Sequence, residues 1–183
     1  MMPLLLELDD DTWSSQVDRV ERWLATSRML QAAYARVLES TLNGVAEPHI
    51  RSYLDELLEV AREHENRVDD LYRAFGREPA AVGTVRSTAS ALLAMTREAV
   101  GHAEGTAGGA ASGPWRGLRE VLLSNVDAIA GFAVTEQLGL ALGVPAVVDV
   151  TMPVVRRKTQ DQLLLQEYLL EMASNAVLRG RDF

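Results

Sequence analysis

The sequence predicts an all-α fold that contains four long helices. In four segments apolar residues recur every three to four positions, which is the spacing of one face of an α-helix. No stretch of useful length alternates apolar and polar residues, as a half-buried strand does. Glycine or proline stands near the ends of these segments, where it stops one helix or begins the next. Because 183 residues fit one domain, we expect a single helical-bundle domain over residues 1–183.

The first two helices are predicted to form an antiparallel pair. The first begins at Asp11 or Thr12, either of which can cap it. It ends at Asn43 and Gly44, which both tolerate a left-handed backbone. The second covers about 48–75, with a proline in its first turn and a glycine after its end. The loop between them is short, so the two helices should pack side by side in opposite directions.

A long connection over residues 76–114 separates this pair from the rest of the chain. It contains a weaker apolar pattern over 84–102, which predicts a short extra helix. Residues 105–114 are mostly glycine, alanine, serine and threonine, so we expect a flexible loop there. We interpret the whole stretch as a crossover within one domain.

The last two helices are predicted to form a second hairpin. The third helix covers about 115–142 and is broken by the Gly-Val-Pro sequence at 143–145. The fourth is expected to follow the stretch from Asp149 to Pro153 and to continue to about Leu178. The chain therefore consists of two helical hairpins and one long crossover, which is the plan of the ferritin-like bundle.

The segment from Leu38 through Leu142 resembles bacterial ferritin-like proteins, including the stress-associated YciE/YciF-type group. The likeness rests on AREHENRVDDLYRAFGREP at residues 61–79 and on AVTEQLGLALG at residues 133–143. In that group the second helix similarly ends before a glycine and a proline-containing turn, and the third ends in a small-residue Leu-Gly stop. The resemblance implies a ferritin-like four-helix bundle of two antiparallel helix pairs, with an extra helix in the long crossover.

The resemblance also implies a metal pair, of iron or manganese, at the bundle centre. Its usual ligands are a Glu from each of two helices and a Glu-x-x-His step from each of the other two. That step does not occur here, because an alanine stands three residues before each of the three histidines, His49, His64 and His102. The missing step favours a metal centre that is lost or remodelled, and a protein with no cofactor.

His64 and Glu136 are the candidate metal ligands. His64 lies on the inward stripe of the second helix, and Glu136 is in phase with Ile129 and Phe132 on the third. Further ligands would have to come from other carboxylates: Glu21, Glu63 or Asp127. The alternative for His64 is a hydrogen-bonded core histidine. The alternative for Glu136 is a structural salt bridge to a cation at the start of the last helix: Arg156, Arg157 or Lys158.

A second set of polar residues interrupts the apolar stripes. These polar core candidates are Ser27, Gln31, Asn125, Thr159, Gln162 and Gln166. They face solvent or a partner, or they form a neutral hydrogen-bonded core in place of a metal site, or they line a pocket for a neutral polar ligand. A buried polar cluster is tolerated only when its members are satisfied.

Composition excludes several classes of protein. With 18 basic and 26 acidic residues the net charge is −8, which argues against nucleic-acid binding. The absence of cysteine excludes thiolate metal sites and a cysteine nucleophile. We find no signal peptide and no apolar run of about 18 residues, so we expect a cytoplasmic protein that does not contact membranes. Lys158 is the single lysine; arginine supplies the other basic residues, as codon bias in a GC-rich genome explains.

Three functions stay open. The first is a ferritin-like bundle with a lost or remodelled metal centre that acts as a structural, stress-associated or partner-binding module. The second is a divergent non-haem di-iron or manganese oxidase or storage protein. The third is a metal-free enzyme or small-ligand binder that uses the polar core, although no pattern identifies a catalytic residue. The leucine-rich stretch 163–170 is apolar over more than one face, which predicts a homodimer through the first or last helix.

Overall fold

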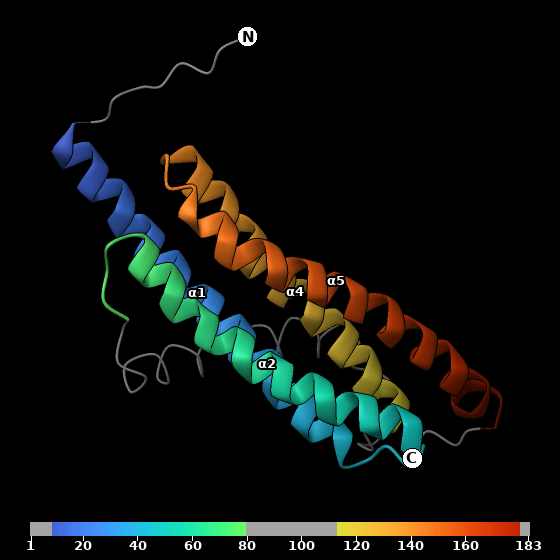
Figure 1. Cartoon of the computed structure of the whole chain (residues 1–183). Helices are drawn as coiled ribbons and strands as arrows, with labels where there is room; N and C mark the ends of the chain where they lie inside the picture. The colour runs from blue at the N-terminus through green and yellow to red at the C-terminus, as the bar shows by residue number, and fades with distance from the viewer. Residues whose placement is uncertain (1–8, 80–112, 180–183) are drawn as a thin grey trace, which may run out of the picture.

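The computed structural model describes residues 9–79 and 113–179, and within these ranges every regular element is helical. The four long helices are α1 (Asp10–Leu42), α2 (Pro48–Ala74), α4 (Pro114–Ala141) and α5 (Ala146–Ala173) (Figure 1). A short π-helix, η1 (Ser174–Leu178), continues α5. The prediction of an all-α bundle is confirmed. The predicted crossover helix and nearly all of the glycine-rich loop lie outside the described residues.

The helices pack as two antiparallel pairs. Tight turns join α1 to α2 and α4 to α5 (Figure 1). Across the pairs, Gln31 of α1 reaches Ala128 of α4 while Trp23 reaches Thr135, so α1 and α4 run in opposite directions. Since α2 is also antiparallel to α1, α2 and α4 are parallel. The end of α2 and the start of α4 therefore lie at opposite ends of the bundle.

The helix ends differ in detail from the sequence-based expectation. Asp9 caps α1, because its carboxylate accepts a hydrogen bond from the backbone N–H of Thr12 at 2.8 Å. The turn after α1 does not use a left-handed residue, since Asn43 has a φ of −67°. The left-handed positions are Gly76 and Gly143, after α2 and α4, with φ values of 68° and 71°.

The expected start of the last helix was wrong, because α5 begins at Ala146 and contains Pro153. Buried Val147 and Val154 continue the inward stripe through this first part of the helix. The proline removes one hydrogen bond, to the carbonyl of Asp149. Both Pro153 and Asp149 are exposed, so water can satisfy that carbonyl. Burial of the apolar face outweighs the local cost of the proline.

The interior consists of two apolar clusters with polar residues between them. On α1 one cluster ends at Leu24 and the other begins at Tyr34. The same interruption occurs on α2 and on α5. The buried polar residues in these gaps and on α4 at the same depth include Arg28, which pairs with Asp69. The others are called the polar layer here: Ser27, Gln31, His64, Asn125, Lys158 and Asp161.

Exposed large apolar side chains are confined to one half of the described structure. They all lie on α4, α5 and η1: Leu123, Val126, Val134, Leu140, Met152, Leu163, Leu164, Leu170, Val177 and Leu178. Among the described residues none of the helices is both long enough and apolar enough to cross a membrane. The outer faces of the two hairpins therefore differ in chemistry.

Candidate site in the buried polar layer

Helix α1 contributes Ser27 and Gln31 to the polar layer, and both are fully buried. The amide nitrogen of Gln31 donates a hydrogen bond to the carbonyl of Ala128 at 2.7 Å. This close approach of α1 to α4 needs Gly131, because a Cβ there would lie 2.8 Å from the Ser27 hydroxyl. The glycine therefore allows two polar side chains to enter the bundle interior.

Helices α4 and α5 are linked through Asn125. Its amide nitrogen donates to the carbonyl of Lys158 at 3.0 Å and to the side-chain oxygen of Gln162 at 2.8 Å. These two buried hydrogen bonds fix the register of α4 against α5 at the depth of Lys158. The position of Lys158 in the interior follows from this register.

Lys158 is the most unusual residue of the layer, since only 1% of it is exposed. Its ammonium nitrogen lies 4.1 Å from the ring centre of Tyr34, within the range of a cation–π contact. Within the described structure this nitrogen has no hydrogen-bond partner. Burial lowers the pKa of Lys158 to about 7, although the attraction of Asp161 works in the opposite direction.

Asp161 is also buried, with 2% exposed, but unlike Lys158 it is hydrogen-bonded through its side chain. It accepts a hydrogen bond from the Tyr53 hydroxyl at 2.7 Å and two from Arg157 Nε at 3.0 and 3.2 Å. Arg157 also donates to Glu56 at 2.8 Å. A buried carboxylate with this set of donors is a structural ion pair.

His64 lies at the edge of the layer in a cationic environment. Burial and the charges of Lys158, Arg157 and Arg67 together lower its pKa to about 3. Its ring is therefore neutral at neutral pH. The Nδ1 atom is buried and has no partner within the described part of the chain.

Several other buried atoms of this region also lack partners among the described residues. They are the Tyr34 hydroxyl, Ser27 Oγ, Gln31 Oε1 and Asn125 Oδ1. Unmatched buried polar atoms are rare in proteins and mark places where water or a ligand is bound. The unmatched atoms of the layer thus belong to neutral amides, hydroxyls and an imidazole, together with the Lys158 amine.

The six polar core candidates divide into two groups. Ser27, Gln31 and Asn125 are fully buried, and Gln162 is half-buried and bonded to Asn125. Thr159 and Gln166 are exposed, so they do not belong to the core. The hydroxyl of Thr159 instead donates to the carbonyl of Val155 in its own helix.

Glu136 and His64 have different neighbours. Glu136 accepts a hydrogen bond from the buried Thr151 hydroxyl at 2.7 Å. The expected salt bridge from Glu136 to Lys158 is wrong, because the amine points to Tyr34 and has no hydrogen-bond partner in the described ranges. Arg157 pairs with Glu56 and Asp161 instead.

The described residues do not suit a metal pair. Such a site needs several carboxylates around the bundle centre, and three or more His, Asp or Glu side chains are nowhere grouped to hold a metal in residues 9–79 and 113–179. The buried carboxylate Asp161 is bonded to Arg157 and Tyr53. The Lys158 amine adds a repulsive charge when it is protonated.

Sequence reasoning missed Lys158 and Asp161 as core residues, although a signal was present. The inward stripe of α5 has spacings of three, four and seven residues: Val147, Thr151, Val154, Lys158, Asp161, Leu165 and Met172. Both charged residues are in phase with this stripe. The single lysine of the chain is thus the one on the buried face, which codon bias does not explain.

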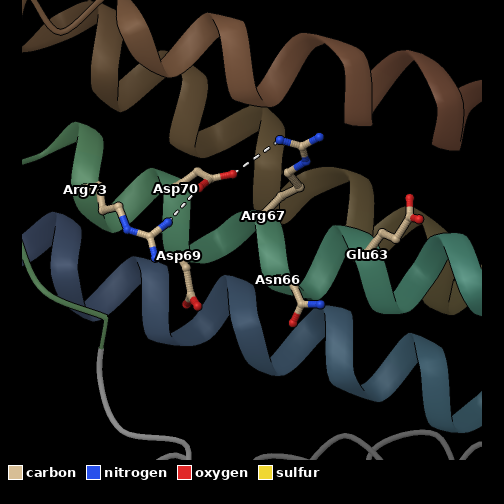
Figure 2. Close-up of a pocket in the computed structure, with 6 residues that line it drawn as sticks. All are labelled: Glu63, Asn66, Arg67, Asp69, Asp70 and Arg73. Atoms are coloured by element: carbon tan, nitrogen blue, oxygen red, sulfur yellow. Dashed lines mark hydrogen bonds and ion pairs between the residues drawn. The ribbon is translucent and has the colours of Figure 1, made fainter.

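A second candidate region is a charged depression on the surface of α2. Figure 2 shows its lining side chains: Glu63, Asn66, Arg67, Asp69, Asp70 and Arg73. Asp70 pairs with Arg67 at 3.4 Å and with Arg73 at 2.8 Å. Asp69 pairs with Arg28 of α1. These charges are matched locally and exposed to water, so the depression has no evident binding chemistry.

Fold and site together define an all-α bundle of four long helices with a buried polar layer. No protein-family model and no curated protein matches the sequence significantly. The chain is similar in structure to a protein from Xanthomonas campestris pv. campestris, known from a crystal structure, with a TM-score of 0.67. The two share 10% identity over 91% of this chain and 99% of that chain, so the likeness concerns the fold alone.

Proposed function

We propose that this chain is a ferritin-like bundle in which the metal centre has been replaced by a lysine-centred polar layer. It acts as a cytoplasmic structural, stress-associated or partner-binding module. The observation that carries the proposal is the position of Lys158, which is 1% exposed and lies against Tyr34 between the two apolar clusters. An amine at this depth brings a positive charge to the bundle centre when it is protonated and disfavours a second cation there.

The apolar outer face of the second hairpin supports a role in binding. On α5, Leu163 and Leu170 stand seven residues apart and are 60% and 74% exposed, and Val177 of η1, which is 66% exposed, follows seven residues later. A seven-residue apolar spacing within α5 places Leu163 and Leu170 in one narrow seam along the helix. Such a seam fits the same seam on a second copy of the chain, which favours a homodimer through α5.

A variant pair tests the homodimer. Light scattering of the full chain at micromolar concentration should give twice the monomer mass. Replacing Leu163 and Leu170 by glutamine should give a monomer of unchanged helix content. Leu123→Gln with Val126→Gln removes two other exposed apolar side chains, which are 51% and 49% exposed, from α4 and should leave the dimer intact. A wild-type monomer would refute the proposed interface.

A small-ligand binder is the second candidate function. It is favoured by the unpartnered buried atoms around Lys158, which offer hydrogen bonds to a guest. A neutral organic ligand that raises the melting temperature of the wild type, but not of Lys158→Met, would move the assignment to this second function.

A further inference from the structure

We propose that the polar layer binds a small monovalent anion, held by the ammonium of Lys158 and the hydroxyl of Tyr34. This goes beyond the module function, which depends on the outer face of the bundle. The argument rests on the charge, the geometry and the enclosure of the layer.

The charge of Lys158 has no bonded counter-ion. Asp161 is the carboxylate that attracts it, but the oxygens of Asp161 already accept hydrogen bonds from Tyr53 and Arg157. An isolated buried ammonium is costly, and an anion in contact with it removes much of that cost. One buried cation without a bonded partner calls for one negative charge, so a monovalent anion fits better than a divalent one.

The geometry provides a second donor beside the amine. The ammonium nitrogen stands 4.1 Å from the Tyr34 ring centre, and the hydroxyl at the edge of the same ring has no partner within the described residues. Two hydrogen bonds of ~2.8 Å each allow one bridging atom to reach both donors. The free oxygens of Gln31 and Asn125 are acceptors, so the anion contacts the Lys158 and Tyr34 side of the layer.

The enclosure limits the size of the guest. Ser27, Gln31 and Asn125 are fully buried, and Lys158 is nearly so. Only an anion of one to a few atoms, such as chloride or formate, is expected to enter without opening the bundle. A bulky anion such as gluconate should be excluded.

Anion binding is coupled to protonation of the amine. The titratable or charged groups that face Lys158 are Tyr34 on α1, His64 on α2, and Asp161 with Arg157 on α5; α4 contributes the neutral Asn125. His64 stays neutral above pH 4, so it does not supply the proton. Binding should therefore weaken about tenfold per pH unit once Lys158 is neutral.

The single lysine makes the test direct. Isotope-labelled lysine gives one side-chain NMR signal from the full chain, and its titration yields the pKa of Lys158. At equal ionic strength, chloride or formate at ten times the dissociation constant should raise this pKa by ~1 unit over its value in gluconate. Tyr34→Phe keeps the ring and removes the hydroxyl, so the shift should need a several-fold higher anion concentration.

Tyr72→Phe is the matched control, because Tyr72 is a buried tyrosine of the other apolar cluster. It should leave the anion effect unchanged. Three results would overturn the proposal: a pKa of Lys158 equal in chloride, formate and gluconate; an equal shift in Tyr34→Phe; or a pKa near the ordinary value of 10.5 in gluconate.

Discussion

Lys158 and Asp161 lie one turn apart on the buried face of α5 and carry opposite charges, yet their surroundings differ. Asp161 accepts hydrogen bonds from two helices, through Tyr53 of α2 and Arg157 of its own helix. Lys158 contacts the face of Tyr34 and has no hydrogen bond in the described part of the chain. The comparison separates two uses of a buried charge. One fixes the packing of α2 against α5, and the other keeps an unsatisfied group at the bundle centre.

The largest change in stability is expected from a substitution of Asp161, the buried charge that accepts hydrogen bonds. Asp161→Asn should lower the free energy of unfolding by about 3 kcal/mol, because Arg157 loses its buried partner. Urea denaturation measures the change. Glu56→Gln removes the exposed partner of the same arginine and should cost less than ~1 kcal/mol. Equal costs for the two variants would mean that burial of Asp161 contributes nothing.

A substitution of Lys158, the buried charge without a hydrogen bond in the described residues, should change the stability in the opposite direction. Lys158→Met keeps an unbranched side chain, one atom shorter, and removes a buried charge without a hydrogen-bonded partner in the described residues. It should raise the free energy of unfolding at pH 7 by about 2 kcal/mol, as measured by the same denaturation. A loss of stability of similar size would show that the amine is well satisfied in the folded protein.

The pH dependence of the stability tests the environment of Lys158 separately. The folded protein releases the Lys158 proton at about pH 7, whereas the unfolded chain keeps it until about 10.5. Between these values the unfolded state binds more protons, so stability rises with pH by up to ~1.4 kcal/mol per unit. Urea titrations at pH 7, 8 and 9 measure this slope. The slope should be absent from Lys158→Met, and a slope retained in that variant contradicts the assignment to Lys158.

A smaller change in stability is expected below pH 6.5, through His64. His64 has a pKa of about 3 in the folded protein and 6.5 as its ordinary value. The unfolded chain therefore binds a proton first as the pH falls below 6.5, and stability declines. The loss between pH 6.5 and 5.5 should be ~1 kcal/mol. His64→Gln should remove this part of the decline, and an unchanged acid profile would mean that His64 is charged in the folded state.

The helices could be predicted from the sequence because the apolar spacing is regular in each of them. The failure at α5 is instructive. Pro153 looked like a helix start, but the buried positions of Val147 and Val154 extend the helix past it. Local proline signals were outweighed by tertiary burial, which no short window of sequence contains.

The candidate site could be predicted only in part. Ser27, Gln31 and Asn125 were recognised because they interrupt apolar stripes. Lys158 was one of three cations expected near Glu136, since sequence alone does not tell which helix faces which at a given depth. The pairing of α4 with α5 through Asn125 decides that the amine points to Tyr34 instead.

The metal content of the protein tests the account most directly. The full chain should be purified without a histidine tag or chelator, loaded aerobically with iron(II), and analysed by mass spectrometry. A lysine-centred layer predicts far less than one metal per chain, with no difference between the wild type and His64→Ala. About two metals per chain, lost in His64→Ala, would contradict it and would identify a divergent di-metal protein.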